Sequence, residues 1–126
     1  MPTDQIPSNE HFISLDRAIE MTTRYRENKE KILSEEFKNK DILPIAETFN
    51  KQAFTSFFTN PACTSIRIYY GMSDDLQTHA IVVGVNDKNE DILPGSSLLT
   101  VPDPPVIVED AYRCPPICSA SPLNPI

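Results

Sequence analysis

The distribution of proline is the feature of this sequence that most constrains its fold. Seven of the 12 prolines lie in the last 25 residues, and the whole chain has only 3 glycines. Proline fixes its own φ angle and has no N–H to donate, so a proline-rich segment does not form an interior strand or a helix. The sequence therefore predicts a polar lead over residues 1–13, a single domain over residues 11–100 and an extended tail over residues 101–126. We expect the tail to pack on the domain or on a partner.

The length and composition suit one small globular domain. The chain has 126 residues, of which 40% are hydrophobic and 23% charged. Its net charge of −7 argues against a fold-wide basic surface for nucleic acid or anionic lipid, so neither partner is expected. The longest apolar run, residues 80–85, is far shorter than the roughly 20 residues of a membrane span. Three cysteines, an odd number, favour a reducing cytoplasm as the location.

Two helices are expected, each with a recognisable start. Ser14 offers a hydroxyl N-cap, and apolar residues then recur every three or four positions up to Leu33, which predicts an amphipathic helix docked on a core. Asn50 is the N-cap of a second, shorter helix, which ends before Pro61 because the residue preceding a proline avoids the helical region. The buried face of this second helix is expected to contain Ala53, Phe54, Phe57 and Phe58.

Strand signals follow in the second half of the chain. Residues 65–72 alternate in the period of a half-buried strand, with Ile66, Ile68, Tyr70 and Met72 on one face. Residues 78–85 are almost wholly apolar, which predicts a central strand covered on both faces. Residues 91–93 and 106–108 predict short additional strands, the latter at the sheet edge. The expected fold class is α+β: a small, mainly antiparallel sheet of three to five strands, packed by two helices, with an extended proline-rich tail.

One short segment occurs twice. Residues 38–44 read K-N-K-D-I-L-P and residues 88–94 read K-N-E-D-I-L-P, whereas the flanking residues differ. We interpret the two copies as similar entries from a loop into an edge strand, with gene duplication as the alternative.

Several blocks of the sequence resemble a known group of proteins. These blocks are residues 13–26, 63–72, 81–86 and 113–118, followed by S-P-L-N at 121–124. They resemble a group of small uncharacterised bacterial proteins whose proline-rich tail contains R-C-P-P-x-C. The resemblance implies that the tail is a regular part of the protein. No activity is established for that group, so the resemblance implies no catalytic residue.

The cysteines are the first candidates for a chemical site. Cys114 and Cys118, together with Cys63 and either His79 or His11, have the residue types of a zinc site. An extended path through the two intervening prolines separates the Cα atoms of the tail cysteines by ~12 Å. A disulfide needs roughly 4.4–6.8 Å, so closing this loop requires a turn or a cis peptide bond. We favour two small apolar contacts that anchor the tail, with a metal or redox site as the alternative.

No catalytic residue is expected from the remaining patterns. Cys63 followed by His79 has the types of a nucleophile and its base, but a buried cysteine beside a partly buried histidine is the commoner arrangement. Asp74 and Asp75 fit a turn between strands better than an acid–base pair or a Ca²⁺ or Mg²⁺ site. The usual phosphate-binding, nucleophile-elbow and zinc-protease motifs are missing from the sequence. We therefore expect no cofactor.

Two groups of residues are candidates for binding a protein partner. Arg67 and Tyr69 share one face of a predicted strand, where an arginine beside a tyrosine can form an interface, although a solvated face is the simpler interpretation. Arg113, Pro115 and Pro116 lie in the extended tail. Our leading hypothesis is a non-enzymatic binding or assembly module that recruits a polypeptide, or a second copy of itself, through a sheet edge or the tail. The alternatives are a ligand-binding or enzymatic pocket between helix and sheet, and a cysteine-based zinc or redox site.

Overall fold

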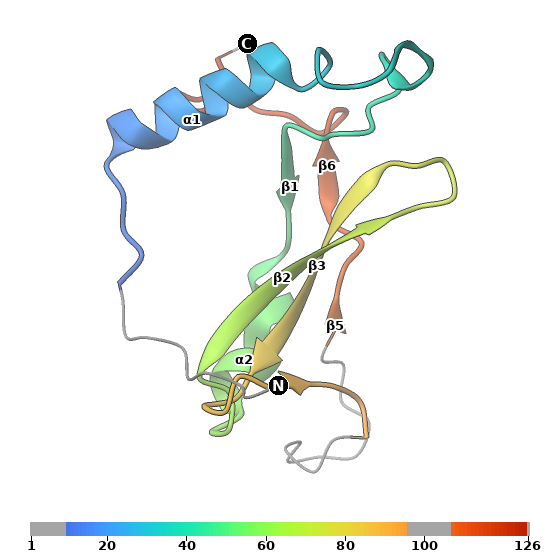
Figure 1. Cartoon of the computed structure of the whole chain (residues 1–126). Helices are drawn as coiled ribbons and strands as arrows, with labels where there is room; N and C mark the ends of the chain where they lie inside the picture. The colour runs from blue at the N-terminus through green and yellow to red at the C-terminus, as the bar shows by residue number, and fades with distance from the viewer. Residues whose placement is uncertain (1–9, 96–106, 126) are drawn as a thin grey trace. The chain divides into compact units, whose positions relative to one another are not determined.

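The computed structural model describes residues 10–95 and 107–125 (Figure 1). They form two α-helices and two antiparallel sheets, of two and four strands, which confirms the expected α+β class. None of the helices in these two ranges has the length and apolar character needed to cross a membrane. The described residues divide into two compact units. Residues 49–71, 80–95 and 107–111 form what we call the sheet unit, and residues 10–48, 72–79 and 112–125 form the helix unit.

This division differs from the predicted boundaries at residues 11–100 and 101–126. The tail is built into both units: residues 107–111 belong to the sheet unit and residues 112–125 to the helix unit. The physical reason is strand pairing, because tail strands join both sheets instead of running over a finished surface. The parts of the predicted lead and tail at residues 1–9, 101–106 and 126 lie outside the described residues.

Strand β3 (Thr78–Val85) is the centre of the larger sheet. It pairs with β2 (Ser65–Met72), with β4 (Asp91–Ile92) and with β5 (Ile107–Val108). Figure 1 shows β2 crossing beside β3. The residues of β3 from Val82 onward are buried, which confirms the prediction of a covered central strand. The predicted edge strand is also confirmed at β5, since Val108 lies opposite Val82.

A small aromatic core closes one face of the sheet unit. The 3-10 helix η2 (Lys51–Phe54) begins after Asn50 and continues into α2 (Thr55–Thr59), which ends before Pro61 as predicted. Phe57 packs with Val82 and Val108, and Phe49 and Phe54 stack edge to face with ring centroids 5.5 Å apart. Phe58 was also expected in this core, but it is exposed. Because α2 makes little more than one turn, Phe57 takes the buried side and its neighbour points away.

The helix unit is held together differently. Helix α1 (Leu15–Asn28) starts at the predicted cap, where Ser14 Oγ accepts a hydrogen bond from the Arg17 N–H at 3.1 Å. It ends at Asn28, short of Leu33, and none of its residues is buried, so the prediction of a helix docked on a core is wrong. The accompanying sheet pairs β1 (Ala46–Thr48) with β6 (Tyr112–Cys114), and η1 (Glu35–Phe37) lies between α1 and β1. Strands of three residues offer too little apolar surface to bury a four-turn helix.

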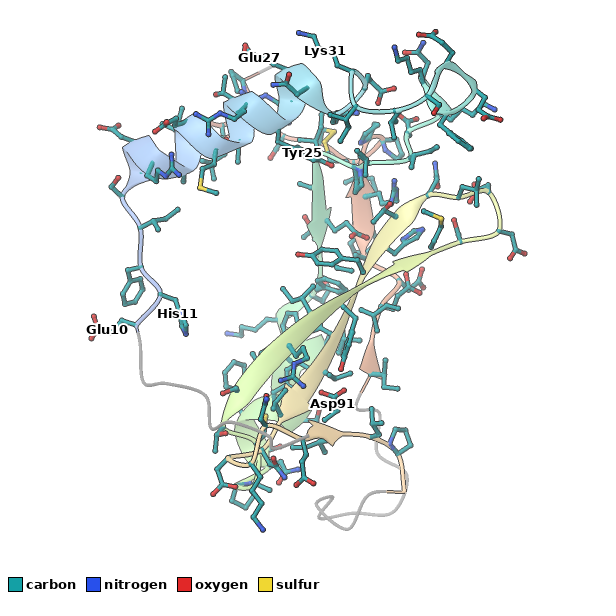
Figure 2. The ribbon with its side chains drawn as sticks, viewed as in Figure 1. Glu10, His11, Tyr25, Glu27, Lys31 and Asp91 are labelled. Carbon is teal, nitrogen blue, oxygen red and sulfur yellow. A yellow bond between two sulfur atoms is a disulfide. The ribbon has the colours of Figure 1, made fainter. Side chains whose placement is uncertain are left out.

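Polar contacts attach α1 to its unit instead. The Tyr25 hydroxyl donates to the Pro44 carbonyl at 2.7 Å, and the Arg26 guanidinium donates to the Leu123 carbonyl. Figure 2 labels Tyr25 beside the C-terminal half of α1. Burial raises the pKa of Tyr25, with Glu30 adding to this effect and Arg113 opposing it. The phenol is therefore kept protonated where it donates this bond.

The repeated K-N-x-D-I-L-P segment contributes one copy to each unit. Asn39 and Asn89 occupy equivalent positions and both have positive φ, 61° and 64°, which asparagine tolerates better than most residues. Ile42 and Ile92 are both buried. The Ile42 carbonyl accepts from the N–H of Thr78, the first residue of β3, whereas Ile92 lies in β4 and pairs near the other end of β3. Each copy thus places its isoleucine against one end of β3, although only the second copy forms a strand.

Candidate functional site

A polar network occupies one face of the sheet unit. Arg67 donates to Asp91 Oδ1 at 2.6 Å and also contacts the Asn89 side chain, while the Tyr69 hydroxyl donates to Asp91 Oδ2. The side chains of Arg67 and Asp91 are 31% and 21% exposed. The pKa of Arg67 is raised, mainly because its guanidinium donates a hydrogen bond to Asp91. Figure 2 labels Asp91 on the sheet. Arg67 and Tyr69, proposed from sequence as a binding pair, are therefore brought together, but both are engaged by one carboxylate.

The turn before β4 positions that carboxylate. Asn86 is buried, and its Oδ1 accepts from the N–H groups of Lys88 and Glu90 at 3.0 and 2.9 Å. Its Nδ2 donates to Glu90 Oε1 at 2.9 Å. An asparagine side chain that bonds to the backbone two residues later makes an Asx turn. This turn fixes where β4 begins and hence where Asp91 faces Arg67.

Strand β2 turns its apolar side chains to solvent. We call Ile66, Ile68, Tyr70 and Met72 the β2 stripe; they are 48%, 53%, 81% and 60% exposed. Side chains alternate along a strand, so these four share the face opposite Arg67 and Tyr69. The sequence predicted this set as the half-buried side of the strand, and that prediction is wrong. The reason is the Asp91 network, which gives Arg67 a partner on the other face.

Among the described residues, no strand pairs with the outer backbone edge of β2. Within residues 10–95 and 107–125, β2 pairs with β3 alone, so it is an edge strand. Edge strands of soluble proteins are usually protected by lysine, proline or a bulge. The eight residues of β2 include one charged side chain, Arg67, whose charge is balanced by Asp91. An open edge therefore coincides with an exposed apolar stripe.

The environment of Cys63 is tight. Its thiol donates to the Ser65 carbonyl at 3.4 Å, and a cavity of about 10 Å³ lies between it, Phe57 and Gly84. A Cβ on Gly84 would lie only 2.8 Å from Cys63 Sγ. A cavity of this size holds at most one water molecule.

His79, the histidine considered as a base for Cys63, belongs to the helix unit, whereas Cys63 belongs to the sheet unit. His79 Nδ1 lies 3.5 Å from Glu47 Oε2, and the two side chains are 21% and 10% exposed. The structure therefore gives His79 a carboxylate neighbour from its own unit. The nucleophile-and-base pairing with Cys63 was the less favoured interpretation of the sequence, and the structure does not test it.

The two tail cysteines form a disulfide. Cys114 and Cys118 are bonded, with Cα atoms 4.8 Å apart, so the preference for two separate apolar contacts is wrong. The argument from an extended path assumed trans peptide bonds, but the bonds preceding Pro115 and Pro116 are both cis. Cys114 is buried beside Asn124, whose Nδ2 lies 3.8 Å from its Sγ. Both Cys114 and Asn124 are buried, so the end of the tail packs against itself around the disulfide.

The disulfide changes the zinc hypothesis, because zinc binds thiolates and not disulfide sulfurs. Across the described ranges of the chain, no three or more His, Cys, Asp and Glu side chains are grouped so that they could hold a metal ion. This includes His11 and His79. Asp74 and Asp75 lie in the turn between β2 and β3, where Ser73 bonds to Asp75 and lowers its pKa.

The other tail residues proposed for binding have distinct environments. Arg113 lies opposite Glu47 in the β1–β6 pair, and its guanidinium donates to the carbonyls of Asp41, Ile42 and Thr78. These bonds connect β6 to residues 41–42 and to the first residue of β3, all within the helix unit. Pro115 is half-buried and Pro116 is exposed, next to Ile117, which is 58% exposed.

Sequence reasoning missed Asp91, Asn89 and Asn86. The residue types were visible, since Arg67 and Asp91 are opposite charges on predicted strands of one sheet. What was missing was the register that puts Asp91 opposite Val85 and so within reach of Arg67. The repeated segment was the available signal, because it keeps both the Asn and the Asp at the same positions.

The fold and these features define a small α+β protein with a partly unprotected antiparallel sheet. Comparison with known proteins adds no relative: no family model, no curated protein and no solved structure matches the chain.

Proposed function

We propose that the chain is a non-enzymatic protein-binding module and that strand β2 is its binding surface. The observation that carries the proposal is the β2 stripe on an edge strand. A polypeptide that pairs with this edge would gain backbone hydrogen bonds, and its apolar side chains would cover the stripe. The resemblance to proteins with the R-C-P-P-x-C tail adds no activity to this proposal.

The apolar surface of the β2 stripe sets the free energy that binding can gain. Full burial of one such side chain is worth about 1.5–3 kcal/mol. The four members are half to four-fifths exposed, so covering them completely would contribute about 4–7 kcal/mol. Lost translational freedom and strand ordering reduce this gain, so a weak dissociation constant of about 0.1–1 mM is expected.

The test uses a labelled eight-residue peptide with alternating valine and threonine, and fluorescence anisotropy. We expect saturable binding to the wild-type protein and a loss of binding in Ile68→Lys, because the lysine places a charge in the middle of the stripe. The matched control is Ile107→Lys on β5, where the isoleucine is 48% exposed. Binding that is absent up to about 1 mM peptide, or unchanged in Ile68→Lys, contradicts the proposal.

The two other hypotheses have less support. The cavity beside Cys63 is too small for a substrate, which weighs against an enzymatic or ligand-binding pocket at that position. A redox role for Cys114 and Cys118 would start from the oxidised pair, since the two are already bonded. That disulfide also weighs against the expected cytoplasmic location, because disulfides persist mainly in oxidising compartments.

A further inference from the structure

We infer that the strand which pairs with β2 is β2 of a second copy of this chain. The inference rests on the proposed function, because it names the partner of the same edge. It commits to a reversible dimer with two-fold symmetry, in which two β2 strands run antiparallel and join two sheets into one.

The sequence of β2 is complementary to itself. In an antiparallel pair centred on Tyr69, residue numbers of facing residues sum to 138, so Ile68 faces Tyr70 and Ile66 faces Met72 of the second copy. The sum is even, so each stripe residue faces a stripe residue on the same side of the joined sheet. Pairs of β-branched and aromatic side chains are among those that stabilise antiparallel strands.

The opposite face tolerates the same register. Arg67 faces Gly71 of the second copy, and glycine has no side chain that could clash with the guanidinium. Arg67 and Tyr69 are directed to Asp91 of their own copy, so the two arginines do not point at each other. A shift by one residue would place the stripe opposite Arg67 and Tyr69, and that register is therefore disfavoured.

Charge and size set the strength of the dimer. The net charge of −7 repels two copies at long range, but the β2 edge itself contributes no unbalanced charge. A stripe of four partly exposed side chains is smaller than the roughly 800 Å² per partner of a standard stable interface. We therefore expect a weak, concentration-dependent dimer and not a permanent one.

The first measurement is sedimentation equilibrium of the full chain at rising concentration. We expect the mean mass to rise from 14.2 kDa towards twice that value, and the dissociation constant to increase about tenfold or more in Ile68→Lys. Ile107→Lys, the same substitution on β5, is expected to dimerise like the wild type. A monomer at all concentrations up to about 1 mM overturns the inference.

The second measurement needs no variant and so does not depend on the folding of Ile68→Lys. Amide hydrogen exchange of the wild-type protein is measured at a low and a high concentration. We expect slower exchange over residues 65–72 at the high concentration, and unchanged exchange in β6. Association without this protection would place the interface elsewhere and overturn the inference.

The two proposals fail separately. If the chain stays monomeric but binds the alternating peptide, the second-copy inference is wrong and the proposed function stands. If the dimer forms, the peptide should compete with it and lower the mean mass. If neither dimer nor peptide binding occurs, both proposals are wrong.

Discussion

Removing the charge of Asp91 should weaken the sheet unit by an amount that the structure allows us to estimate. Asp91 accepts hydrogen bonds from Arg67 and from Tyr69, and its side chain is 21% exposed. Exposed ion pairs are worth about 0.2–1 kcal/mol, whereas breaking a buried pair costs about 3–5 kcal/mol. The network lies between these limits, so Asp91→Asn should lower the free energy of unfolding by about 2 kcal/mol.

A double-mutant cycle separates the pair from its surroundings. Arg67→Met retains most of the side-chain length and removes the charge. We expect a coupling between Arg67 and Asp91 of about 1–1.5 kcal/mol. The loss in Asp91→Asn should exceed this coupling, because the carboxylate also accepts from Tyr69.

Urea denaturation followed by far-UV circular dichroism is a suitable assay. With an m-value of about 1–2 kcal/mol/M, Asp91→Asn should lower the midpoint by roughly 1–2 M. Arg24→Met is the control, since Arg24 and Glu20 form a pair at 3.0 Å but are 61% and 53% exposed; it should leave the midpoint unchanged. A coupling indistinguishable from zero would refute the reasoning, because it would mean that the charges are solvated independently.

Three further outcomes follow from other contacts. Gly84→Ala should destabilise the chain by roughly 1–3 kcal/mol, because its Cβ would lie 2.8 Å from Cys63 Sγ. Adding Cys63→Ala should restore most of this loss in the same urea assay. If the stability losses of the two substitutions simply add, the clash is not the cause. Since the folded pKa of Tyr25 is raised above 10.0, its contribution to stability is complete below that pH and falls as the pH rises through the folded value. Thermal melts from neutral to alkaline pH should show this loss, which must be smaller in Tyr25→Phe. Alkylation of the unfolded chain should modify one thiol without reductant and three thiols after reduction. Reduction of the disulfide should lower the free energy of unfolding by about 2 kcal/mol. Three reactive thiols without reductant would contradict the Cys114–Cys118 bond.

Local sequence signals predicted the elements well. The Ser14 cap, the end of α2 before Pro61 and the covered central strand at residues 78–85 all depend on neighbouring residues or on a simple period. Each of these signals lies within one element. These features could therefore be predicted without knowing how the elements pack together.

The candidate site was harder to predict because it depends on contacts between distant residues. The alternation of residues 65–72 was visible, but not which face is buried, because that depends on Asp91, 24 positions after Arg67. Likewise, the apolar period of α1 did not reveal that its unit lacks a surface to bury it. The disulfide was considered but ranked below two separate contacts, because the peptide-bond isomers at the two prolines cannot be read from a short pattern.

The assignment of β3 to both units has a consequence for how the molecule loses its structure. Its first two residues, Thr78 and His79, belong to the helix unit, and the following residues, from Ala80 to Val85, belong to the sheet unit. A strand shared in this way cannot melt in one unit and stay fully paired in the other. Heating should therefore produce a single cooperative transition, with equal calorimetric and van't Hoff enthalpies, although the chain has two compact parts.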